Sequence, residues 1–146
     1  MRKKLIDELV SLAQQVAAQA MLASGATIVG KWRETQALKT FLETAKSRYA
    51  SSDLVAHIAD RLKGAASFNF GGYDHQTPDV NSVMARVAEL DTLCAGFPDA
   101  VEVKRFFYDL AEQIACASGE GLLGLGERIN SREAMYLQTL RQTLGL

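Results

Sequence analysis

The sequence predicts an all-α protein, a compact bundle of six to seven helices that contains two related helix–loop–helix repeats. Every periodic apolar segment has steps of three and four residues, which is the spacing of a helix with one buried face. Residues 16–25 also match residues 110–119 at five of ten positions, at a constant offset of 94. We therefore expect a single domain over 1–146, with repeat units at about 5–45 and 106–144.

Three helices are expected in the first half of the chain. Each has one apolar stripe, and Ser52 or Asp53 is placed to cap the third helix. The stripes consist of Leu5, Leu9, Leu12, Val16 and Ala20, then Leu38, Leu42, Ala45 and Tyr49, then Leu54, Ile58, Leu62 and Ala66. The pair Gly71-Gly72 then breaks the chain, and no helix is expected to cross it.

Three further helices are expected in the second half. Thr77 supplies a capping hydroxyl, Pro78 suits the first helical position, and Asp79 favours the positive end of a helix dipole. One helix is expected from there to Gly96, a second after residues 98–99, and a third up to the C-terminus. Their stripes consist of Val80, Val83, Val87, Leu90 and Cys94, then Val103, Phe106, Leu110, Ile114 and Ala117, then Leu137, Leu140 and Leu144.

Composition and charge limit the classes of function. A content of 48% hydrophobic residues and two prolines indicates a folded chain, and a net charge of −1 argues against general nucleic-acid binding. Residues 1–64 carry ten basic and six acidic side chains, a net of +4, whereas residues 65–146 carry six and eleven, a net of −5. The two halves could attract each other or present opposite faces to partners, or the imbalance could be ordinary surface scatter.

The location of the protein is inferred from the segments that the sequence lacks. Arg2, Lys3 and Lys4 precede Asp7 and Glu8 in an amphipathic stretch, which is unlike an export signal. No run of about 18 apolar residues predicts a membrane span. The two cysteines lie in apolar helical stretches and do not suggest a disulfide framework. A cytoplasmic protein is therefore expected.

The sequence shows no catalytic constellation, so no catalytic residue is predicted. His57 and His75 lie far apart and are interpreted as structural or solvated side chains. Gly119, Gly121 and Gly124 match the GxGxxG pattern, but a helix precedes them where a dinucleotide site needs a strand. These glycines are interpreted as a tight connection between two helices.

The two glycine-rich loops are the candidate functional segments. Their carboxylates could form an acidic site for a hard cation, or the carboxylates that enter the following helices could simply favour the helix N-termini. No cofactor is expected apart from a weak divalent cation at that site. The candidate acidic residues are Glu34, Glu120, Glu127 and Glu133.

The second loop also carries three large apolar residues. They could tuck under the bundle, as Ile28 and Val29 would in the first loop, or contact another chain. Because the shorter loop already suffices to join its helices, the additional length favours a contact with a protein partner or a second copy in a homo-oligomer. The candidate contact residues are Leu122, Leu123 and Leu125.

Over residues 12–146 the chain resembles the TerB-like family of bacterial tellurite-resistance proteins. The features that carry the resemblance are an Ala-rich helix ending in Ser-Gly, a loop, and a Glu-led helix, together with Phe68-Asn69-Phe70 between the central helices. The resemblance implies a repeat-built, all-α cytoplasmic domain that serves tellurite resistance and stress response. It implies a binding or scaffolding module with protein partners, some of them membrane-associated, and a link to metal sensing.

Two hypotheses of function follow. The first is a non-enzymatic binding or scaffolding module of the tellurite-resistance type, acting through its loops and charged faces. The alternative is a metal-dependent or small-molecule-binding enzyme that uses the second loop and His75. A tight stoichiometric cofactor would favour the enzyme, and a defined protein complex without one would favour the module.

Overall fold

The computed structural model describes residues 2–24, 28–65, 79–117 and 131–146. These residues form seven α-helices and no strand, which confirms the predicted all-α class. The helices are α1 (Arg2–Ser24), α2 (Ile28–Arg48), α3 (Asp53–Ala65), α4 (Val80–Ala88), α5 (Leu90–Leu93), α6 (Ala100–Cys116) and α7 (Ser131–Leu144). None of these helices is long and apolar enough to cross a membrane.

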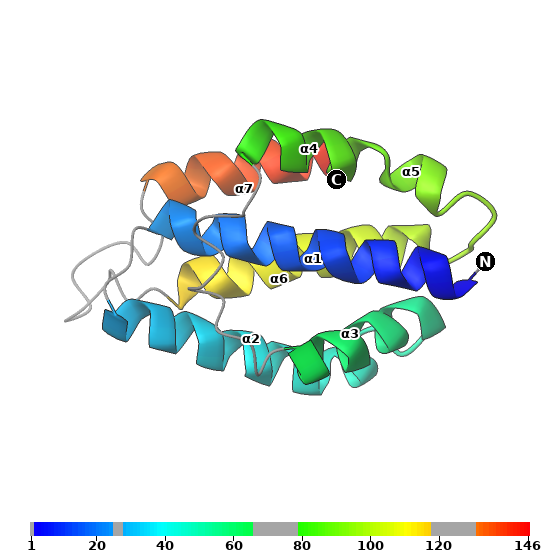
Figure 1. Ribbon diagram of the computed structural model, residues 1–146, viewed down its shortest axis with the longest axis horizontal. Helices are drawn as coiled ribbons and strands as arrows, with labels where there is room; N and C mark the ends of the chain where they lie inside the picture. The colour runs from blue at the N-terminus through cyan, green and yellow to red at the C-terminus, as the bar shows by residue number, and fades with distance from the viewer. Residues whose placement is uncertain (1, 25–27, 66–78, 118–130) are drawn as a thin grey trace.

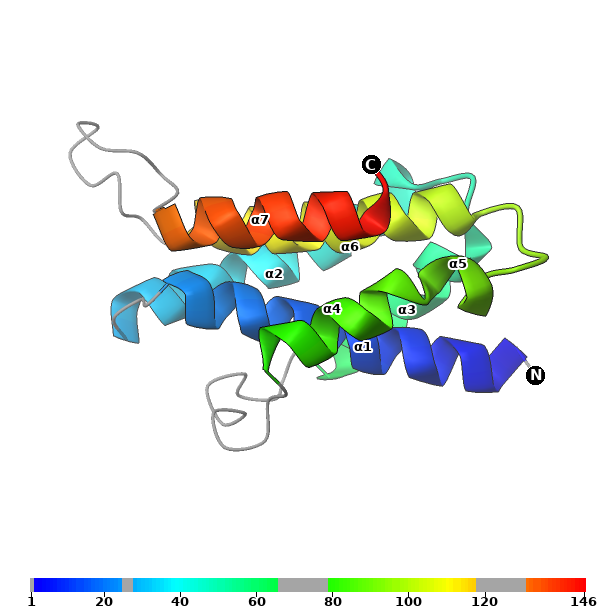
Figure 2. The same cartoon turned by 90° about the horizontal axis from the view of Figure 1, so that it is seen from above.

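The helices form three layers around a central pair. Figure 1 shows α1 and α6 side by side in the middle of the bundle, running in the same direction, with α2 and α3 on one side and α4 and α7 on the other. Figure 2, seen from above, shows α1 and α6 beside each other, with α4 in front of α1 and α7 in front of α6. Each outer layer therefore packs its apolar face against α1 and α6, and the two outer layers do not have to contact each other.

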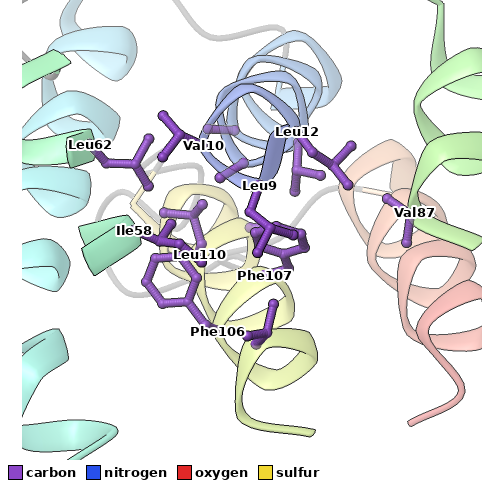
Figure 3. Close-up of a cluster of buried hydrophobic side chains, with 14 of the residues drawn as sticks. Leu9, Val10, Leu12, Ile58, Leu62, Val87, Phe106, Phe107 and Leu110 are labelled. Carbon is purple, nitrogen blue, oxygen red and sulfur yellow. The ribbon is translucent and has the colours of Figure 1, made fainter. Parts of the chain in front are cut away.

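The two central helices carry several of the largest fully buried side chains. Leu9 and Leu12 of α1, and Phe106, Phe107 and Leu110 of α6, are at most 1% exposed. Figure 3 shows Leu9 pointing from α1 toward Phe107, with side chains of α3 on one flank of the pair and of α4 on the other. Full burial of such a side chain stabilises the fold by about 1.5–3 kcal/mol, so this contact accounts for a large share of the folding energy.

Aromatic side chains join the α2 layer to the centre. The rings of Phe41 and Phe106 are stacked with their centroids 5.6 Å apart, and Tyr49 meets Phe106 edge-on at 5.8 Å. The Tyr49 hydroxyl also donates a hydrogen bond to the Asp109 carboxylate on α6. The end of α2 is thereby fixed against α6 by both packing and a polar contact.

Polar contacts hold the opposite layer in the same way. The Tyr136 hydroxyl of α7 donates to the Val16 carbonyl of α1 at 2.9 Å, inside the core. Arg86 Nη1 of α4 donates to Gln15 Oε1 of α1 at 2.6 Å. Each contact fixes the register of an outer helix along α1, which apolar packing alone specifies less sharply.

The predicted single helix before Gly96 is wrong, because the segment forms α4 and α5 with a break at Glu89. The Glu89 amide bonds to the Arg86 carbonyl three residues back, which tightens the chain at this point. Gly96 has a φ of 88°, a conformation that favours glycine, in the turn that follows. Val80 is another correction to the predicted stripe, since it is 40% exposed at the start of α4.

The predicted start of that helix is also wrong in detail. Asp79 is the N-cap of α4, and its Oδ1 accepts a hydrogen bond from the Ser82 amide at 2.8 Å. Asp79 therefore has the capping role that was expected of Thr77, and Pro78 cannot be the first residue of α4. Thr77 and Pro78 themselves lie outside the described residues.

The predicted repeat remains a prediction. Matched positions have matching burial, since Leu38 and Leu137 are both buried, as are Phe41 and Leu140. The helix that follows α1 packs on α6, and the helix that follows α6 packs on both α6 and α1. The contacts of the two units therefore agree only in part, because α7 packs on the helix that precedes it whereas α2 packs mainly on α6 and α3.

The central contact can be tested by truncating one ring. We expect Phe107→Ala to lower the free energy of unfolding by about 3–5 kcal/mol, because the side chain is fully buried and leaves a cavity. Val101→Ala on the same helix is the control, because that side chain is 51% exposed and should change stability by less than about 0.5 kcal/mol. Urea denaturation measures both, and equal effects would contradict the assigned core.

Two buried tyrosines are expected to make the free energy of unfolding depend on pH in the alkaline range. Burial raises the pKa of the Tyr136 phenol above its ordinary value, and burial followed by the bond to Asp109 raises the pKa of Tyr49. In the folded protein both phenols stay protonated above pH 10, whereas in the unfolded chain tyrosine phenols ionise near pH 10. The contribution of these phenols to the stability of the fold is therefore fully present below about pH 10 and is lost as the pH rises above it. We expect Tyr136→Phe to lose stability less steeply between pH 9 and 11, and an unchanged slope would contradict this assignment.

Candidate functional site

The structure describes the side chain of only one of the four predicted loop carboxylates. Glu133 is the third residue of α7 and is fully buried, where the positive end of the helix dipole favours a carboxylate. Glu34 lies in α2, but its side chain is outside the described part. The remaining predicted loop residues lie outside the described residues altogether, and these are Glu120, Glu127, Leu122, Leu123 and Leu125.

Other residues singled out in the sequence have ordinary environments where they are described. His57 is exposed on α3, and His75 lies outside the described residues. Cys94 is buried in the core, and this burial raises the pKa of its thiol. Within the described ranges, no three side chains of His, Cys, Asp or Glu are grouped so that they could hold a metal ion.

A shared cap organises the end of the bundle where α1, α3 and α6 begin. Asp99 precedes α6, yet its Oδ2 accepts hydrogen bonds from the Ser52 hydroxyl at 2.8 Å and from the Leu54 amide at 3.2 Å. The Ser52 hydroxyl oxygen in turn accepts from the Val55 amide at 3.1 Å. Ser52 is therefore the N-cap of α3, one of the two residues predicted, and Asp99 completes the cap from another helix.

An acidic hollow of about 500 Å³ opens beside this cap. Its carboxylates come from the first turn of α3 and from the start of α6, and Phe97 and Pro98 supply an apolar wall. Carboxylates beside an aromatic ring favour a cationic side chain, by charge and by contact with the ring. The lining residues are Ser51, Asp53, Phe97, Pro98, Asp99 and Glu102.

A basic hollow of about 390 Å³ lies between the start of α1 and α3. Lys3, His57 and Arg61 surround it, and Ile6 supplies an apolar wall. Arg61 Nη1 also forms an ion pair with Asp7 Oδ1 at 2.7 Å, and both side chains remain about half exposed. The pair holds the guanidinium in place without removing it from solvent.

The two hollows share α3. Asp53 and His57 are four residues apart and lie one turn from each other on one face of the helix. Figure 1 shows the starts of α1, α3 and α6 together at the end that bears the N-terminus. We call this region, defined by the linings of the acidic and basic hollows, the charged end.

Sequence reasoning did not find the charged end. The sequence shows only that the two halves of the chain have opposite net charges. The contact that builds the acidic hollow joins Ser52 to Asp99, which are 47 residues apart. No local pattern marks such a pair, because the Asp99 carboxylate would equally suit the N-terminus of its own helix.

The shared cap predicts the effect of removing one hydroxyl. We expect Ser52→Ala to destabilise the protein by about 1–2 kcal/mol, because the Val55 amide loses its acceptor and Asp99 loses a donor. Ser47→Ala at an exposed position of α2 serves as the control. In a double-mutant cycle by chemical denaturation, Ser52→Ala and Asp99→Ala should be non-additive, and strictly additive losses would contradict a shared cap.

Comparison with models of protein families, with curated proteins and with solved structures finds no match to this chain.

Proposed function

We propose that the chain is a non-enzymatic binding or scaffolding module that holds a protein partner against its charged end. The observation that supports this proposal is the juxtaposition of an acidic and a basic hollow along one face of α3. Two neighbouring patches of opposite charge fix the orientation of a bound partner, because a partner bound in the reverse orientation would place like charges against each other.

The combination of signs favours a protein over a polyanion. A nucleic acid or an anionic membrane presents one sign over a wide area, and Asp53, Asp99 and Glu102 would repel it. A folded protein or a peptide can present a basic side chain to the acidic hollow and an acidic one to the basic hollow. The mixed charged end therefore suits a protein surface.

The charged end is also arranged before a partner arrives. The Ser52–Asp99 cap joins the start of α3 to the start of α6, and the Arg61–Asp7 pair joins α3 to α1. Because three helix starts are already fixed, little conformational freedom is lost on binding, and this raises the affinity obtainable from few contacts.

The biological setting of the proposal rests on the sequence resemblance. The resemblance to the TerB-like family supports a role in tellurite resistance or stress response in a bacterial cytoplasm, with partners that include membrane-associated proteins. The charged end supplies a surface on which such a partner would be held.

The partner surface can be tested with neutralised variants. We expect Asp53→Asn combined with Glu102→Gln to weaken binding of a partner recovered by crosslinking in cells by about tenfold or more. Asp99 is left intact because it caps α3. Isothermal titration calorimetry measures the loss, which should shrink at high salt because added ions screen exposed charges.

A matched control removes the same amount of charge elsewhere. Glu43→Gln combined with Glu89→Gln neutralises two exposed carboxylates that do not line either hollow, and affinity should stay within about twofold. Equal losses in the two variants, or none in the first, would contradict docking at the charged end. A stoichiometric metal or organic cofactor in the purified protein would contradict the non-enzymatic part.

A further inference from the structure

The basic hollow holds two cationic side chains and a histidine, and one neighbouring carboxylate compensates part of their charge. Lys3 comes from the first turn of α1, while His57 and Arg61 lie one turn apart on α3. Some other cations of the bundle have carboxylate partners, as in the pairs Lys46–Asp60 and Lys104–Asp91. Among the described side chains, Lys3 forms no ion pair, and Asp7 is the carboxylate paired with Arg61.

The geometry of the hollow suits a small anion. The Asp7 carboxylate holds one edge of the Arg61 guanidinium at 2.7 Å, and a guanidinium has five N–H donors in all. The ammonium of Lys3 on α1 and the imidazole of His57 on α3 line the same hollow and add further donors. The N-terminal end of α1, a helix of 23 residues, adds the positive end of its dipole beside Lys3.

We propose that this basic hollow binds the phosphate group of a small soluble phosphate ester. A phosphate offers several oxygens, so a single group can accept hydrogen bonds from a lysine, an arginine and a histidine at the same time. A volume of about 390 Å³ also leaves room for the organic part of the ester, with Ile6 as an apolar contact.

The neighbouring carboxylates determine the size of the ligand. Asp7 borders the hollow through its pair with Arg61, and Asp53 lies one turn before His57 on α3. A single phosphate group can still be attracted by Lys3 and Arg61, but the two carboxylates repel an extended array of phosphates, such as that of a nucleic acid or a lipid surface. A soluble monoester is therefore favoured over a lipid headgroup in a bilayer.

Glycerol 3-phosphate and inorganic phosphate are suitable probes with the whole purified chain. We expect saturable amide shift changes in a ¹H–¹⁵N titration, centred on the start of α1 and on α3, with a millimolar dissociation constant. Lys3→Gln and Arg61→Gln should each weaken binding about fivefold, because each removes one exposed charge contact. Arg61→Lys should recover part of the loss, because it keeps the charge without the planar fork.

Lys63→Gln is the matched control, since it removes a positive charge from the same helix two residues beyond the hollow. Its affinity should stay within about twofold of the unmodified chain. Shifts that do not saturate, or equal losses in Lys63→Gln and Lys3→Gln, would overturn the proposal. Tighter binding to vesicles of phosphatidylglycerol than to glycerol 3-phosphate would also overturn it. Because the assay contains no protein partner, its failure leaves the proposed partner binding unaffected.

Discussion

The contact between α1 and α6 is the interaction on which the rest of the bundle depends. Leu9, Phe106 and Phe107 are fully buried there, and both outer layers use the same two helices as their platform. The buried residues of both helices recur at helical spacing, so each central helix presents an apolar face to its neighbours. The charged side chains of α6, such as Arg105 and Glu112, are not among these buried residues.

This central pair explains why function would be placed at the ends of the helices. Side chains along α1 and α6 are occupied by packing, so surface for recognition remains on outer faces and at helix termini. The cap made by Ser52 and Asp99 shows how one terminus becomes a defined surface, because it fixes α3 and α6 relative to each other. The same contact thus gives acceptors to the first amides of α3, which have no partner within the helix, and shapes the acidic hollow.

Apolar spacing predicted the fold because burial follows helical periodicity. Apolar residues at steps of three and four positions predicted that Leu9, Ile58 and Leu110 belong to the core, and all three are fully buried. The break at Glu89 escaped prediction because Val87 and Leu90 stay buried on both sides of it, so the stripe continues while the helix does not. The candidate site was predicted less well, since the charged end depends on pairs distant in sequence and the predicted loop residues are mostly outside the described part.

The stability of the bundle does not account for the basic hollow. Arg61 and Asp7 are 49% and 47% exposed, and exposed ion pairs contribute about 0–1 kcal/mol. Lys3 adds a further positive charge to the same hollow and, among the described side chains, has no compensating pair. The buried aromatic and aliphatic side chains stabilise the fold far more, at about 1.5–3 kcal/mol each. Charges that contribute so little to folding can be retained for binding, and this is the physical basis for assigning recognition to the basic hollow.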